Sequence, residues 1–120
     1  MLETGITTSQ LSQRELALRF LLRTRCEVEL MRACLPDTKL PIEPPSMQQL
    51  ERMAGKVASS AEAFGFPEIA VIAGAIELIS QAGCARSTLR ERLELATRLI
   101  AQLSALEVQL ESEMGTFLIC

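Results

Sequence analysis

The side chains most often used for catalysis and metal binding are scarce in this chain. Its 120 residues include no histidine, tyrosine or tryptophan. Without an imidazole the chain cannot use histidine as an acid or base, build a Ser-His-Asp triad, or bind a metal through histidine. The sequence also contains no nucleophile–base pair, paired-carboxylate motif, phosphate loop or cofactor fingerprint. We therefore predict a protein that is not an enzyme and that uses neither a metal nor a cofactor.

The four cysteines give no metal-binding signal either. Cys26, Cys34, Cys84 and Cys120 form no Cys-x-x-Cys pair, and a mixed Cys/His site would need a histidine. Residues 1–10 lack the basic and apolar segments of a secretory leader. We predict a cytoplasmic protein whose thiols stay reduced and mostly serve as small core residues.

The overall composition is that of one folded domain. Hydrophobic residues make up 48% of the chain and charged residues 22%, as in soluble globular proteins. Twelve basic and 15 acidic residues give a net charge of −3, which argues against a general nucleic-acid binder held by a basic surface. The longest apolar run, at 69–76, is too short to span a bilayer. We expect neither nucleic acid nor a membrane as a partner.

Helix signals divide the chain into four segments, whereas strand signals are nearly absent. Four amphipathic helices joined by short turns pack most simply as an antiparallel four-helix bundle, so we predict an all-α fold. The predicted helices span about 9–35, 46–64, 67–83 and 88–114. The predicted division is a flexible N-terminus at 1–8, a bundle at 9–114 with a proline-rich loop at 36–45, and a tail at 115–120.

Local signals mark where the helices begin and end. Ser46 and Gln49 form a capping-box pattern at the start of the second helix, and Gly65 is placed to end it. Thr88 and Glu91 form a second capping-box pattern at the start of the fourth helix. Apolar residues at helical spacing predict a core drawn from all four helices. The predicted core residues are Leu18, Leu22, Leu50, Val57, Phe64, Ile69, Ile72, Ile76, Leu93, Ile100 and Leu103.

One stretch of the second helix resembles a known family. Residues 54–65 read Ala-Gly-Lys-Val-Ala-Ser-Ser-Ala-Glu-Ala-Phe-Gly. This is similar to the histidine-containing phosphotransfer (HPt) domain, whose second bundle helix reads roughly Ala-His-x-Leu-Lys-Gly-Ser-Ala, with a glycine near the following turn. Ala54, Val57, Ser60 and Ala61 match that pattern, as does Gly65. Helix order and lengths fit as well, so the resemblance covers about 10–112. It implies an HPt-like bundle.

The residues that differ from the family pattern are those that transfer phosphate. Gly55 stands where the phosphorylated histidine belongs, Ala58 replaces the lysine that helps hold the phosphoryl group, and Ser59 replaces a small glycine. Transfer needs a nucleophile and a cation nearby. Lys56 matches a position that is often basic, but it lies about 100° round the helix from position 55 and cannot substitute. The resemblance therefore implies a degenerate HPt domain that does not accept phosphate.

The resemblance implies that the chain functions by binding a partner. HPt domains dock receiver domains through the exposed face around the active histidine. We therefore expect a non-catalytic module of two-component or phosphorelay type that binds a receiver domain or a histidine kinase. Gly55 has two open interpretations, a flat patch for a partner or, within the helix, a tolerated cost or close-packing site. A histidine replaced on purpose is disfavoured, because the lysine expected at position 58 is missing as well. The predicted partner-binding residues are Gln48, Arg52, Gly55, Lys56, Ser59 and Glu62.

The third predicted helix suggests an alternative function, because it is apolar nearly all round. Val71, Ala75 and Leu78 form a second stripe that the core does not need. Either the tail at 117–119 or the loop at 40–42 covers this stripe, or it is a surface for partner binding or homodimer formation. In the second case the chain is a helical adaptor or regulatory protein unrelated to phosphorelays.

Overall fold

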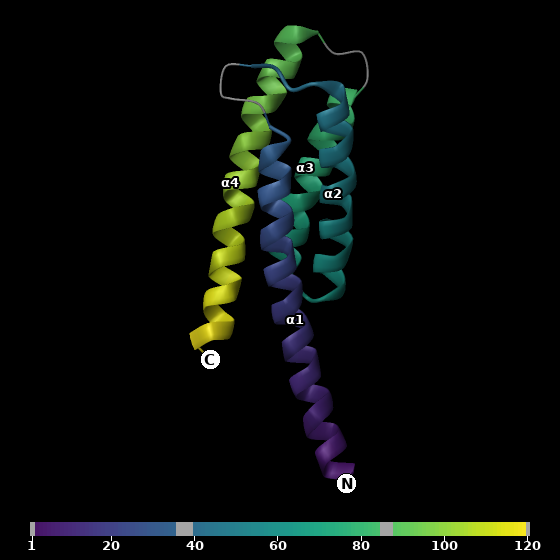
Figure 1. The fold of residues 1–120 in the computed structure, drawn as a ribbon, viewed down its shortest axis with the longest axis vertical. Helices are drawn as coiled ribbons and strands as arrows, with labels where there is room; N and C mark the ends of the chain where they lie inside the picture. The colour runs from purple at the N-terminus through teal and green to yellow at the C-terminus, as the bar shows by residue number, and fades with distance from the viewer. Residues whose placement is uncertain (1, 36–39, 85–87, 120) are drawn as a thin grey trace.

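Four helices form the computed structural model, which describes residues 2–35, 40–84 and 88–119. They are α1 (Leu2–Ala33), α2 (Pro44–Ala63), α3 (Pro67–Cys84) and α4 (Leu89–Ile119), and no described residue lies in a strand. Figure 1 shows them running alternately up and down. The predicted all-α, antiparallel four-helix bundle is confirmed.

The four helices lie at the corners of a roughly square cross-section, so that each has two neighbours. Each helix packs against the next one along the chain, and α1 closes the bundle against α4. The α2–α3 pair is the most closely packed and the α1–α2 pair the least. The described residues of α1 and α3 lie on a diagonal and do not pack together. The molecule measures 63 × 24 × 19 Å. It is elongated because the N-terminal part of α1 extends past the α2–α3 turn (Figure 1).

Two of the three predicted helix-end signals are confirmed. Gly65 has φ of 83° just after α2, a conformation that favours glycine. At α4, the Glu91 amide donates to Thr88 Oγ1 at 3.2 Å, and the Thr88 amide donates to Glu91 Oε1 at 3.4 Å. The capping box predicted at Ser46 is wrong, because α2 begins earlier, with prolines at its first two positions and no side-chain cap. Proline's fixed φ suits a first helical turn, so those prolines belong to the helix and not to the loop.

The outer helices are longer than predicted. The α1 backbone is helical from Leu2, not from about 9, and α4 continues to Ile119, not to about 114. No proline occurs in either added stretch, and a mid-helix glycine such as Gly115 costs only about 1 kcal/mol, which is too little to end a long helix. Helical backbone therefore crosses both boundaries of the predicted 9–114 bundle. The flexibility expected for 1–8 stays a prediction.

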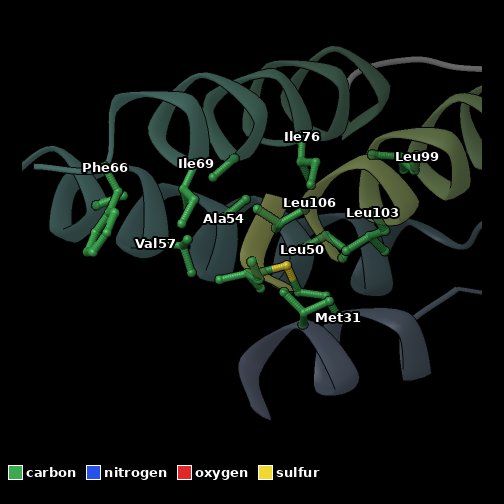
Figure 2. Close-up of a cluster of buried hydrophobic side chains, with 14 of the residues drawn as sticks. Met31, Leu50, Ala54, Val57, Phe66, Ile69, Ile76, Leu99, Leu103 and Leu106 are labelled. Atoms are coloured by element: carbon green, nitrogen blue, oxygen red, sulfur yellow. The ribbon is translucent and has the colours of Figure 1, made fainter. Parts of the chain in front are cut away.

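The core contains apolar residues of all four helices (Figure 2). Five predicted core residues are buried: Leu50, Val57, Ile69, Ile76 and Leu103. Three more, Leu18, Ile72 and Ile100, are half-buried.

The core prediction is wrong for three residues. Leu22, Phe64 and Leu93 keep 45%, 39% and 37% of their surface exposed. Leu21 takes the core position of α1 instead, and its neighbour Leu22 is turned about 100° away. Phe64 follows the last residue of α2, and Leu93 lies in the first turns of α4, where the bundle ends.

All four phenylalanines of the chain gather at one end of the bundle. Phe20 of α1 stacks on Phe64 and Phe66, with ring centroids 5.0 and 5.7 Å away. Phe66 also contacts Phe117 of α4 at 6.1 Å. Arg14 lies over the Phe117 ring at 5.6 Å and donates to the Phe117 carbonyl at 3.1 Å. The cluster ties α1, the α2–α3 turn and α4 together.

The C-terminal end of α3 is tightly packed. A Cβ on Gly83 would meet the Met47 sulfur and would lie 2.6 Å from Leu95 Cδ1. One turn earlier, Ser80 is fully buried, and its hydroxyl has no hydrogen-bond partner among the described residues. A buried hydroxyl without a partner keeps its desolvation penalty, so we expect Ser80 to cost the fold some stability.

Candidate partner-binding site

The outer face of α2 presents the predicted partner-binding strip to solvent. The opposite face of this helix buries Met47, Leu50, Ala54, Val57 and Ala61, and this fixes the rotation of α2 in the bundle. The side chains turned away from the core are exposed, as the sequence predicted. They are Gln48, Arg52, Lys56, Ser59 and Glu62.

Gly55 differs from the rest of the strip, because a side chain from α3 covers it. A Cβ built on Gly55 would lie 2.5 Å from Glu77 Oε2 and 3.2 Å from Glu77 Cδ. Gly55 is accordingly half-buried. Gly55 therefore does not face only water, and a bulky side chain at this position would collide with Glu77. Of the two interpretations of Gly55, close helix packing is the one that the geometry supports.

A shallow hollow of about 630 Å³ follows this face of α2. Arg52, Gly55, Lys56 and Ser59 line it, whereas Gln48 and Glu62 do not. Its walls also include residues that the sequence did not indicate, because they come from neighbouring helices. These are Phe20, Arg23, Thr24 and Glu27 of α1 and Glu77 of α3.

The hollow is mixed in charge. Arg23, Arg52 and Lys56 are its basic residues, and Glu27, Glu51 and Glu77 are its acidic ones. Ser59 and Ser60 supply hydroxyl groups, but no imidazole accompanies them in a chain without histidine. Across the described residues, no group of three or more cysteine, aspartate or glutamate side chains is placed to hold a metal ion. The charged and hydroxyl groups of the hollow can form hydrogen bonds and ion pairs.

The cysteines whose side chains are described do not lie in the core. Cys26 is exposed on α1, and Cys34 is half-buried. The prediction of small core residues is thus wrong for Cys26. Burial raises the pKa of the Cys34 thiol, because desolvation disfavours the thiolate. The side chains of Cys84 and Cys120 lie outside the described residues.

The apolar stripe of α3 is open to solvent. Val71 and Leu78 are 72% and 66% exposed, and Ala75 between them is half-buried. The loop does not cover them, since Ile42 is buried in the core and Leu40 is 54% exposed. Phe117 of the tail packs against Phe66, and the side chains of residues 118 and 119 lie outside the description. The stripe is thus a candidate surface for partner binding. Separately, no described helix is long and apolar enough to cross a membrane.

Fold and site together define an all-α four-helix bundle with a hollowed polar face on α2 and an apolar stripe on α3. Comparison with known proteins finds no match among family models, curated proteins or solved structures. The resemblance to HPt domains therefore stays a prediction from the sequence.

Proposed function

We propose that this chain is a non-catalytic, HPt-like signalling module of the two-component or phosphorelay type. It binds a receiver domain or a histidine kinase and does not accept phosphate. The observation that carries the proposal is the outer face of α2, where the residues around the histidine-equivalent Gly55 are exposed and border one hollow. A docking surface needs exposed side chains on a rigid element, and α2 offers both.

Three features of position 55 argue against phosphotransfer. Glycine supplies no nucleophile, and the family's lysine is replaced by Ala58, which is half-buried. The Glu77 carboxylate lies against position 55, so a phosphoryl group brought there would meet a negative charge. Phosphoryl transfer depends on positive charge around the transferring group. The same helix face can dock a partner without carrying out the reaction.

Binding and transfer are tested separately. The full chain is titrated with receiver domains, with and without beryllofluoride, by isothermal calorimetry. Lys56→Glu in the hollow is expected to weaken binding by about tenfold, whereas Arg98→Glu, on an exposed position of α4, leaves it unchanged. Equal effects of the two substitutions, or no binding of any receiver or kinase, overturn the proposal.

Incubation with a phosphorylated receiver or kinase is expected to leave no acid-labile phosphate on the chain. Gly55→His alone is expected to stay slow, because position 58 supplies no cation and Glu77 occupies the adjacent space. Adding Ala58→Lys should help more than either change alone. Fast transfer by the single Gly55→His variant would contradict this account of the site.

A second candidate function is supported by the exposure of Val71 and Leu78. In this case the chain is a helical adaptor or regulatory protein that acts through α3, by binding a partner or another copy of itself. Leu78→Glu then abolishes association, and Lys56→Glu has no effect. The opposite pair of results favours receiver docking.

A further inference from the structure

The carboxylate of Glu77 takes the place that a side chain at position 55 would fill. A Cβ built on Gly55 would lie 2.5 Å from Glu77 Oε2 and 3.8 Å from Glu77 Oε1. Apart from the adjacent residues and the helix backbone, the three heavy atoms nearest to that Cβ all belong to the Glu77 carboxyl group. Because α2 and α3 are the most closely packed pair of helices, the packing of the bundle holds this contact. Glycine, without a side chain, leaves the carboxylate room to lie against α2.

No described residue pairs with the Glu77 carboxylate. Glu77 is half-buried, and the only other charged residue of α3 is Glu68, so its own helix offers no cation. Arg23, Arg52 and Lys56 line the same hollow, but none of them forms an ion pair with it. These three side chains are exposed, so water and salt screen their charges more strongly than that of the half-buried carboxylate. The charge that lies directly against position 55 is therefore negative.

Position 55 is also the place to which the proposed function brings the partner's phosphorylation site. In an HPt domain this position carries the histidine that exchanges a phosphoryl group with a receiver, and exchange requires the two reacting groups to be in contact. A receiver that docks on this chain in the same way places its phosphoryl group, when it carries one, against the Glu77 carboxylate. Like charges brought together at an interface weaken binding. An unphosphorylated receiver brings less negative charge to the same place.

We propose that this module selects the unphosphorylated state of its receiver partner, and that Glu77 is the residue responsible. The inference rests on the proposed function, in its receiver-binding form, and adds to it the state that is bound. A glycine at position 55 by itself prevents phosphotransfer but does not distinguish the two receiver states. The carboxylate beside it makes binding depend on phosphorylation. A receiver is then held while it is unphosphorylated and released when it gains a phosphoryl group.

Calorimetric titration of the full chain with a receiver domain, with and without beryllofluoride, measures this selectivity. Beryllofluoride on the receiver's aspartate imitates the phosphoryl group, and the wild type is expected to bind that form about tenfold more weakly. Glu77→Gln removes the charge and keeps the shape, so it should reduce the difference to less than about twofold. Glu62→Gln is the matched control, because it removes a carboxylate from the same strip of α2 but outside the hollow. It should keep the wild-type preference.

An introduced histidine reports the charge at position 55 without any partner. The chain contains no histidine, so Gly55→His gives a single imidazole to follow by proton NMR. A neighbouring carboxylate favours the imidazolium form. The pKa of this imidazole should therefore lie above the ordinary value for histidine and should fall when Glu77→Gln is added. Adding Glu62→Gln instead should leave the pKa nearly unchanged. Circular dichroism checks that each variant is folded.

The outcomes separate this inference from the proposed function. If neither a receiver nor a kinase binds the wild type, the proposed function is overturned and this inference with it. Four other results overturn this inference alone. They are binding of kinases only, equal binding of the two receiver states, tighter binding with beryllofluoride, and an unchanged preference after Glu77→Gln. An imidazole pKa below the ordinary value would also overturn it, because the basic residues of the hollow would then determine the charge felt at position 55.

Discussion

The contact between Gly55 and Glu77 makes a quantitative prediction about stability. Replacing a glycine inside a helix with alanine raises helix propensity by about 1 kcal/mol. In Gly55→Ala the new Cβ would lie 2.5 Å from Glu77 Oε2, so the carboxylate must move. Glu77 is half-buried, and a strained rotamer costs about 0.5–1.5 kcal/mol. The two effects nearly cancel, and we expect the free energy of unfolding to change by less than about 0.5 kcal/mol.

Without the Glu77 side chain, the gain in helix propensity from Gly55→Ala should appear as a gain in stability. In a Glu77→Ala background, Gly55→Ala is expected to stabilise the fold by about 1 kcal/mol, or roughly 4 °C in Tm for a domain of this size. The difference between the two backgrounds is a coupling free energy of about 0.5–1.5 kcal/mol. Urea denaturation of the four proteins of the cycle, followed by far-ultraviolet circular dichroism, measures it.

Gly74→Ala is the matched control for this cycle. Nothing lies within 4 Å of a Cβ at position 74, so the substitution should stabilise by about 1 kcal/mol in both backgrounds. Equal effects of Gly55→Ala with and without Glu77 would refute the contact. A loss of more than about 1.5 kcal/mol in the Glu77→Ala background would mean that something other than this carboxylate blocks position 55.

The remaining predictions concern other parts of the bundle. Gly83→Ala is expected to destabilise by about 1–3 kcal/mol in urea denaturation, since its Cβ would collide with the buried Met47 and the half-buried Leu95. Ser80→Ala should be neutral or stabilise by up to about 1 kcal/mol, because it removes a buried hydroxyl without a partner; a clear loss would contradict that assignment. Thr88→Ala should cost about 1 kcal/mol of unfolding free energy through loss of the α4 cap. At mildly alkaline pH, iodoacetamide should label Cys26 before Cys34, whose raised pKa keeps less of it as thiolate; mass spectrometry of the peptides decides.

The sequence predicted the parts of the fold that depend on local signals. Gly65 and the Thr88 capping box mark helix ends through backbone chemistry that nearby residues determine. Exposure of the α2 strip followed from the helical period once its apolar row was recognised. The capping box predicted at Ser46 was wrong, because the two prolines before it already suit a first helical turn.

What the sequence could not predict depends on how one helix is placed against another. Leu21 and Leu22 are both leucines, and only the rotation of α1 in the bundle decides which of them is buried. Glu77 reaches Gly55 because α2 and α3 pack closely in one register. The spacing of apolar residues within a single helix does not determine that register. The only local hint was Glu77 itself, a lone charge in the middle of an apolar helix.

The phenylalanine cluster has a consequence for how the molecule can be observed. With no tryptophan or tyrosine, its four phenylalanines are the only aromatic chromophores of the chain. All four lie at the end of the bundle that holds the α2–α3 turn. Near-ultraviolet circular dichroism, which responds to fixed aromatic packing, therefore reports on that end alone. Fraying at the opposite end, where α4 begins at its Thr88 cap, would be silent in that signal and visible only through the backbone.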